Sequence, residues 1–220
     1  MTISGFGIDE TTNNSIITIS LSENTPEPEK VAVTDETGEF ENWVWVLEKP
    51  YCGVPMLGSI AAFTAGYTNI AVGIGATSFG ADNHSIGSTS FTEGMGNTAL
   101  YCAHAEGRDT KAIGYMSHSE GTETVANGYG SHAEGFSSQA NGAQSHAEGS
   151  KSIASGAQSH SEGNSTIASG NQSHSEGIGS KATGVAAHAE GNKTEASGAS
   201  SHAEGQETVA SNTYAHAEGF

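Results

Sequence analysis

Histidine and glutamate recur at a fixed spacing through the second half of the 220-residue chain. One histidine occurs every fourteen residues from His104 to His216, and each stands in a His-(Ala/Ser)-Glu-Gly segment. Imidazole and carboxylate groups can act as general acids and bases, ligate metal ions or form charge-assisted hydrogen bonds. The candidate residues are His104, Glu106, His118, Glu120, His132, Glu134, His146, Glu148, His160, Glu162, His174, Glu176, His188, Glu190, His202, Glu204, His216 and Glu218.

The regularity of this set argues against catalysis, because a catalytic pair is normally single and irregularly placed. The chain also lacks Gly-x-Ser-x-Gly, phosphate-loop and His-Glu-x-x-His motifs. We therefore expect no enzymatic activity and no catalytic residues. Three imidazoles on a three-fold axis could bind a transition metal, and the histidines could also sense pH. The interpretation that we favour is a structural ladder of hydrogen-bonded His and Glu side chains, with no metal and no cofactor.

A weaker repeat lies between the histidine segments and defines the structural unit. Seven residues after each of the first eight histidines comes x-Ala-x-Gly, as in KAIG at 111–114 and IASG at 153–156. The alternating small residue indicates a short strand, and the glycine indicates a corner. In the last copy Asn212 replaces the glycine, and because Asn tolerates positive φ we expect a left-handed backbone at this position. Two strands and two corners per fourteen residues predict a flattened parallel β-roll.

The seven-residue step extends back to FTAG at 63–66, although TALY at 98–101 brings His104 one residue early. We interpret this shift as a one-residue deletion in a corner. The expected fold is all-β, a parallel β-roll solenoid over residues 63–220 with 14-residue coils. About 11 to 12 coils at ~4.8 Å each would give a rod of roughly 55 Å.

The composition of the repeat region predicts association with other chains. From Ala103 to Phe220 only 13 residues are Ile, Leu, Val, Met, Phe, Tyr or Trp, too few for a globular core. A thin roll filled with Ala and Ser buries little apolar area to offset the entropy of ordering. The His and Glu flanks are the same in every coil, whereas the flanks of the other strand vary. We therefore predict that the His–Glu face lies on the axis of a homotrimer and that the other face is exposed.

The repeat resembles that of a known family. TNIAVG at 68–73 is similar to the repeat of the YadA-like heads of trimeric adhesins, and the Ser-His-Ala-Glu-Gly form resembles a repeat of bacteriophage tail fibres. The resemblance covers 63–220 and implies a trimeric left-handed parallel β-roll. It also implies that two apolar flanks, matched here by Ile70 and Val72 and then by His84 and Ile86, point to the trimer interior. From residue 104 onward His and Glu replace both apolar residues, which departs from the family pattern.

Residues 1–62 differ from the repeat and predict a small β-rich module for attachment or capping. An extended stretch lies at 15–21, and the segments 30–34 and 40–47 predict a hairpin with Trp43 and Trp45 on one side. The first residues lack the features of a secretory signal, and no apolar run is long enough to span a membrane. We expect Cys52 and Cys102 to be free thiols.

Charge and organisation together indicate a class of function. The formal net charge of −18, with only 7 Lys and Arg residues, argues against nucleic acid as a partner. We expect a trimeric fibre protein of a phage tail or contractile injection particle, located in the virion tail or particle. Its partners would be sister chains, other particle proteins bound through residues 1–62, and a glycan or protein receptor on a cell surface. The alternative is the head fragment of a trimeric autotransporter adhesin that binds host matrix from the bacterial cell surface.

Overall fold

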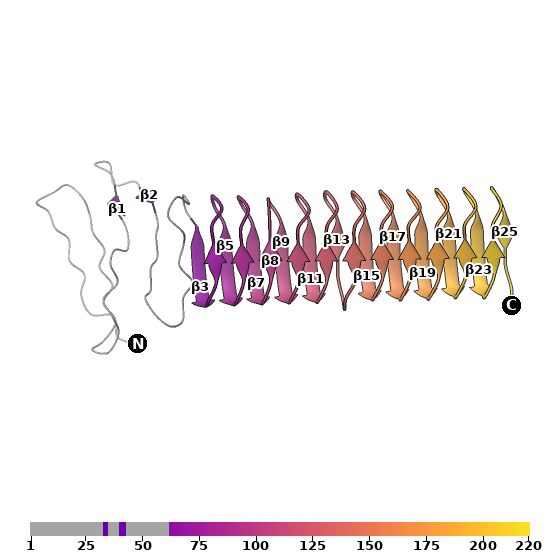
Figure 1. The fold of residues 1–220 in the computed structure, drawn as a ribbon, viewed down its shortest axis with the longest axis horizontal. Helices are drawn as coiled ribbons and strands as arrows, with labels where there is room; N and C mark the ends of the chain where they lie inside the picture. Colours follow the sequence, from indigo (N-terminus) through magenta and orange to yellow (C-terminus); the bar gives the residue numbers. More distant parts are fainter. Residues whose placement is uncertain (1–32, 35–39, 43–61) are drawn as a thin grey trace, which may run out of the picture.

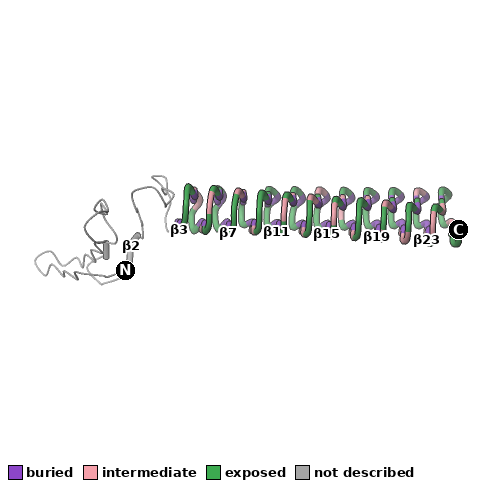
Figure 2. Tube along the Cα trace, turned by 90° about the horizontal axis from the view of Figure 1, so that it is seen from below, coloured by how far each residue is buried: buried purple, intermediate pink, exposed green. Residues whose placement is uncertain are grey.

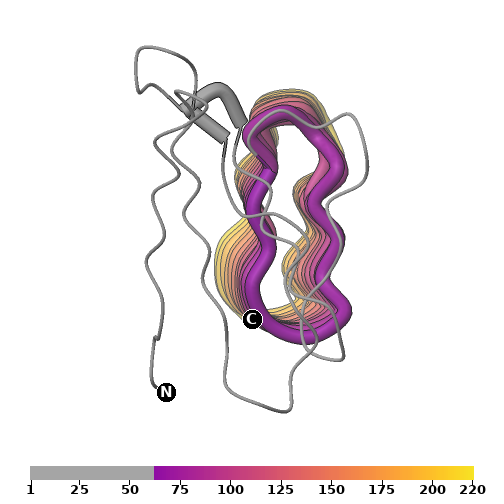
Figure 3. The backbone as a smooth tube through the Cα atoms, turned by 90° about the vertical axis from the view of Figure 1, so that its left-hand side faces the viewer, coloured from indigo at the N-terminus to yellow at the C-terminus, as the bar shows by residue number. Residues whose placement is uncertain are grey.

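The computed structural model describes residues 33–34, 40–42 and 62–220. From residue 62 onward the chain winds into a two-sided parallel β-solenoid, which Figure 1 shows from the side with its axis horizontal. One side is a sheet of 12 strands and the other a sheet of 11 strands, which confirms the predicted all-β roll of 11 to 12 coils. Seen end-on, successive coils superpose as a narrow closed outline with two long sides (Figure 3).

The 12-stranded sheet, here called the ladder sheet, contains the histidine segments. Its strands are β3 (Phe63–Tyr67), β5 (Thr77–Ala81), β7 (Phe91–Met95), β9 (His104–Arg108), β11 (His118–Thr122), β13 (His132–Ala133), β15 (His146–Ser150), β17 (His160–Asn164), β19 (His174–Ile178), β21 (His188–Asn192), β23 (His202–Gln206) and β25 (His216–Ala217).

The 11-stranded sheet, here called the second sheet, contains the x-Ala-x-Gly segments. Its strands are β4 (Ile70–Ala71), β6 (His84–Ser85), β8 (Thr98–Ala99), β10 (Lys111–Ala112), β12 (Val125–Ala126), β14 (Gln139–Ala140), β16 (Ile153–Ala154), β18 (Ile167–Ala168), β20 (Lys181–Ala182), β22 (Glu195–Ala196) and β24 (Val209–Ala210).

Two further strands lie in the predicted N-terminal module. β1 (Val33–Thr34) pairs antiparallel with β2 (Phe40–Asn42), as expected for the hairpin. The extended stretch at 15–21 and the two tryptophans fall outside the described residues, so the rest of this module stays a prediction.

The register between coils is nearly constant. His118 lies opposite His104 and Glu120 opposite Glu106, so equivalent residues fourteen positions apart stack directly on one another. The exception is the step from β7 to β9, where Phe91 lies opposite His104 after thirteen residues. Thr98 already lies opposite His84 at the normal spacing, so the missing residue belongs to the corner that follows β8. The predicted deletion is therefore confirmed.

Small side chains fill the space between the two sheets, and buried residues line the inside of each coil (Figure 2). Every buried apolar residue in the described part of the chain is an alanine. The buried polar residues are Ser, Thr and Asn, and their polar groups are largely satisfied inside the roll. Ser145, for example, donates a 2.7 Å hydrogen bond to the carbonyl of Gly142. The narrow interior explains the shortage of bulky apolar residues in the sequence.

An asparagine column, which the sequence analysis did not identify, supports the first coils. The amide of Asn69 donates to the carbonyls of Ala65 and Gly80, each at 2.8 Å, and its oxygen accepts from the backbone amide of Asn83. Asn83 and Asn97 repeat this pattern, and Thr or Ser takes the position in later coils. The signal was present in the sequence as Asn at 69, 83 and 97 with the same fourteen-residue period.

The prediction of a left-handed backbone at the glycine of x-Ala-x-Gly is wrong. Gly142 and its equivalents are absent from the positive-φ residues, as is Asn212, and the left-handed residue of this corner comes two positions later, as at Gln144 with φ of 57°. Glycine is required for a different reason, since a Cβ on Gly142 would lie 2.0 Å from the carbonyl oxygen of Gly156. No coil of the described chain stacks over Asn212, so its Cβ meets no such carbonyl.

A pair of Gly→Ala substitutions separates these two reasons for glycine. Gly142→Ala forces a Cβ against backbone of the next coil, so we expect a large drop in melting temperature, measured by circular dichroism. Gly179→Ala is the control, because its φ is 66° and its nearest neighbour, Cγ of Lys193, is 3.5 Å away. Its cost should be limited to the left-handed penalty of about 1–2 kcal/mol. Equal losses in the two variants would contradict this explanation.

Candidate functional site

The ladder sheet places all the predicted His and Glu residues on one outer face. Each repeated strand begins with His, continues with a buried Ala or Ser, and then presents Glu, as in His146, Ala147 and Glu148. Because side chains alternate across a strand, His and Glu both point away from the roll interior. In-register pairing then stacks each His on a His and each Glu on a Glu. We call this face the ladder face.

The imidazole rings form a continuous stack along the ladder face. Neighbouring ring centroids are 4.7–5.0 Å apart from His104 to His216, and the angles between ring planes run from 1° to 32°. The stack continues into the first coils as aromatic rings, since Phe91 packs edge-on against His104 at 4.8 Å. Phe79 and Phe63 extend it further. Phe63 and Phe91 were missed as part of the face, although FTAG and FTEG occupy the repeat position of His-Ala-Glu-Gly; Phe79 stands in the column of the glutamates, opposite Glu93.

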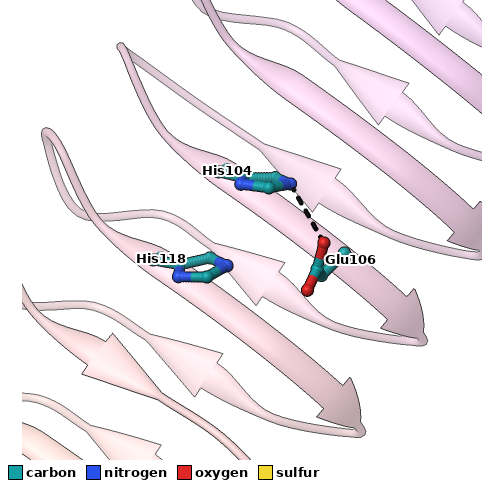
Figure 4. A group of neighbouring side chains, drawn as sticks. All are labelled: His104, Glu106 and His118. Carbon is teal, nitrogen blue, oxygen red and sulfur yellow. Dashed lines mark ion pairs between the residues drawn. The ribbon is translucent and has the colours of Figure 1, made fainter.

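Each histidine lies close to glutamates of its own coil and, in the central coils, of the preceding coil. The distance from Nε2 to the carboxylate of the same coil is 3.4–4.0 Å, and Figure 4 shows His104 with Glu106 at 3.4 Å. His132 also approaches Glu120 of the coil before it at 3.7 Å. His132 and Glu134 are 35% and 33% exposed, so both sides of the ladder are accessible in the single chain.

The ladder predicted from the sequence has each His donating a hydrogen bond to a Glu of a neighbouring chain, and within the single chain these Nε2 atoms do not hydrogen-bond to Glu. The Nε2 atoms of the first eight ladder histidines, His104 to His202, are buried and have no hydrogen-bond partner. The expected donation to a Glu of a neighbouring chain stays a prediction. A buried polar atom without a partner costs free energy, so each of these atoms is a position where a further ligand or a chain would be stabilising.

The pKa values of the stacked carboxylates shift in alternating directions from Glu120 to Glu162. Hydrogen bonds shared with Glu134 and Glu106 raise the pKa of Glu120 to about 7, and hydrogen bonds shared with Glu134 and Glu162 raise the pKa of Glu148 to about 7. Hydrogen bonds from Glu148 and Glu120 lower the pKa of Glu134. A protonated carboxyl group thus donates to its ionised neighbours, which relieves the repulsion of a column of like charges.

Burial and the neighbouring rings keep the central imidazoles neutral. Desolvation, and then the adjacent histidine, lower the pKa values of His118, His132, His146, His160 and His174 below their ordinary value. A stack of rings this close could not all carry charge without strong mutual repulsion.

A shallow groove runs beside the imidazole stack. It has a volume of about 630 Å³ and is lined by Glu93, Glu106, Glu120 and Glu134 together with Gly107, Gly121, Gly135 and Gly149. The glycines form its floor because they carry no side chain, and the carboxylates form its wall. The groove is therefore acidic and follows the roll axis.

The apolar flanks matched by the family resemblance lie on the second sheet and not on the ladder face. Ile70 lies in β4 of the second sheet, where it pairs with His84, and its column continues to Thr98 and Lys111. The ladder face instead begins with Phe63, and its column reaches His104 three coils later, through Thr77 and Phe91. Ile70 and Val72 therefore do not become His and Glu in later coils, and the equivalence is wrong. His84 is exposed and takes no part in the ladder.

Comparisons with known proteins add no relative. No family model matches the chain, and no curated protein is similar to it. No helix of the described residues is long and apolar enough to cross a membrane. Cys102 is a free, exposed thiol as expected, whereas Cys52 lies outside the described residues.

The ladder makes opposing contributions to stability as pH changes. A histidine whose pKa is lowered on folding binds fewer protons folded than unfolded, so stability rises with pH up to about 6.5. Glu120 and Glu148 have the opposite effect, because their pKa values are raised on folding. Their contribution to the free energy of unfolding is complete below about pH 4.5 and is lost as the pH rises to about 7.

Two double variants should separate these contributions. Replacing Glu120 and Glu148 by Gln removes the second effect, so we expect the melting temperature to rise with pH more steeply than in the unmodified chain between about pH 5 and pH 7. Replacing His132 and His146 by Gln removes the first effect. The slope of melting temperature against pH should then be more negative than in the unmodified chain over the same range. Melting curves by circular dichroism give both slopes, and identical slopes in all three proteins would refute the assignment.

Proposed function

We propose that the chain is the rod-forming subunit of a homotrimeric fibre of a phage tail or contractile injection particle, with a structural and adhesive role rather than a catalytic one. The observation that carries the proposal is the interior of the roll, in which alanine is the only apolar residue buried among the described residues. The fibre would position or form an element that recognises a cell surface.

The energetics favour association. Ordering a residue costs about 1–2 kcal/mol of backbone entropy, and a buried alanine methyl returns only a small part of that at ~25 cal/mol per Å². The missing stabilisation has to come from contacts outside the single roll. The ladder face is the one surface that is chemically the same from His104 to His216, so it is the face that an axis shared with two sister chains would select. The neighbouring phenylalanines Phe63 and Phe91 would add apolar contact at one end of that axis.

A rod built this way suits presentation at a distance. Backbone hydrogen bonds join every coil to the next from residue 62 onward, so the roll transmits force along its length without flexible joints. In this proposal residues 1–62 attach the rod to other proteins of the virion tail or injection particle.

The receptor surface would lie at the corner where the chain passes from the second sheet to the ladder sheet. Exposed aromatic residues gather at this corner. Tyr101, Tyr115 and Tyr129 are 61%, 46% and 53% exposed, and the last two rings stack at 5.8 Å. Met116 is 54% exposed beside them. Exposed tyrosines offer an apolar face and a hydroxyl group together, a combination suited to sugars and to protein surfaces. A glycan or protein on the target cell would bind here.

The trimer is tested with cysteines placed on the two sheets. In a chain with Cys52 and Cys102 replaced by Ser, His146→Cys should give disulfide-linked chains on mild oxidation, because three copies would meet on the axis. The control Gln139→Cys lies on the exposed second sheet and should stay monomeric on a denaturing gel. Light scattering of the unmodified protein should give three chains per particle. A monomer at micromolar concentration, or cross-linking only through Gln139→Cys, would overturn the arrangement.

The adhesive role is tested by binding to whole cells and to a glycan panel. Replacing Tyr101, Tyr115 and Tyr129 by Ala should reduce binding at least tenfold while the melting temperature stays within a few degrees, because these side chains are exposed. Val185→Ala, at an exposed corner further along the roll, is the control and should bind normally. Equal binding by both variants would exclude this corner as the receptor surface.

A further inference from the structure

The ladder face repeats one arrangement of three potential metal ligands. Two histidines of adjacent coils and the glutamate of one of those coils offer ligand atoms that lie within 4.8 Å of one another, as in His104, Glu106 and His118. Groups of this kind recur eight times among the described residues. Figure 4 shows the first, in which both rings turn their edges toward the same carboxylate. Two nitrogens and one oxygen are a ligand set typical of zinc and related transition metals, not of calcium or magnesium.

The distances fit a tetrahedral ion at the level of one coil. Zinc binds imidazole nitrogen and carboxylate oxygen at about 2.0–2.2 Å, so two ligands of a tetrahedral site lie about 3.4 Å apart. The distance from Nε2 of the histidine to Oε2 of the glutamate in the same coil is close to this value. It is 3.4 Å for His104 and Glu106, 3.4 Å for His174 and Glu176, and 3.5 Å for His188 and Glu190. The in-coil pair is therefore preformed as a chelate.

The second histidine has to tilt toward its neighbour to complete the site. Ring centroids of adjacent histidines are 4.7–4.8 Å apart in most of the stack, and a shared ion needs the two Nε2 atoms closer than this. The rings have room to tilt, because the planes of His160 and His174 already differ by 32°. The Nε2 atoms of these histidines are buried and make no hydrogen bond. The carboxylates that they approach, at 3.7 Å for His160 and 3.4 Å for His174, belong to ladder glutamates that can themselves be ligands, so binding an ion breaks no hydrogen bond at Nε2.

We propose that the ladder face is an array of binding sites for divalent transition-metal ions, zinc above all, each formed by Nε2 of two adjacent ladder histidines and a carboxylate of the glutamate between them. The sites lie within one chain, so the proposal does not rest on the trimer. Water or a second carboxylate completes the coordination. Because each ion joins two successive coils, metal binding stabilises the roll as a clamp that acts only on the folded state.

The arrangement fixes the stoichiometry. One Nε2 atom has a single lone pair and can bind one ion, so two neighbouring sites that share a histidine cannot both be filled. Nine histidines in a row therefore hold at most four ions per chain. If each histidine bound an ion independently of its neighbours, the number of ions would not be limited in this way.

The first experiment counts ions on the full-length, untagged chain. The protein is stripped with a chelator, titrated with zinc chloride in a calorimeter, and analysed for zinc after gel filtration. We expect saturation near four ions per chain and a melting temperature that rises with zinc concentration. Failure to saturate, or saturation at one ion or none, would overturn the proposal.

Two variants with the same number of histidines removed test the role of adjacency. The alternating variant leaves no two neighbouring histidines, and we expect it to lose the zinc sites; it carries His118→Gln, His146→Gln, His174→Gln and His202→Gln. The contiguous variant leaves five neighbouring histidines, and we expect it to bind two ions; it carries His174→Gln, His188→Gln, His202→Gln and His216→Gln. Equal zinc binding by the two variants would show that the pairs are not the sites.

A spectroscopic measurement on the unmodified protein does not depend on the folding of any variant. X-ray absorption at the zinc edge reports how many imidazoles surround each ion. We expect two imidazoles per zinc, with oxygen completing the shell. A count of one imidazole or none would overturn the proposal even where the stoichiometry agrees.

Discussion

In-register hydrogen bonding between parallel coils is the interaction on which the structure depends. It stacks every residue on its own equivalent about 4.8 Å away, so each position is selected for how well it tolerates a copy of itself. Asn69, Asn83 and Asn97 gain from this, because the side-chain oxygen of one accepts a hydrogen bond from the backbone N–H of the next. Gly142 is required by it, because a side chain would meet the next backbone carbonyl. Stacked carboxylates are penalised by it, and the interaction between neighbours raises the pKa of Glu120 while it lowers the pKa of Glu134.

The fourteen-residue period was sufficient to predict the roll, its 11 to 12 coils and the short corner before His104, because register in a solenoid follows directly from repeat length. The repeat could not predict why glycine is required at a given position, because a close approach of backbone and a positive φ both select glycine. It also could not decide the side on which Ile70 lies, because both half-turns share the pattern x-small-x-Gly and differ only by seven residues. The shared outer face of His and Glu was predictable from strand alternation. The lack of hydrogen bonds at Nε2 was not, because it depends on side-chain geometry finer than the repeat specifies.

The ladder face combines groups that are costly when left alone. Its imidazoles are neutral and lack partners at Nε2, and its glutamates line an acidic groove beside them. A cation and a sister chain would satisfy different parts of this surface, since an ion held by three side chains keeps a fourth coordination position open. The metal array and the shared axis that we propose are therefore compatible on the same face.

The nearly constant step between coils also governs how such a protein can change during evolution. Each coil contacts only its two neighbours, so removing or duplicating fourteen residues leaves every remaining contact of the same kind. Removing or adding one coil would change the length of the rod by about 4.8 Å. The length of the roll can therefore vary by whole coils while the alanine-lined interior stays the same.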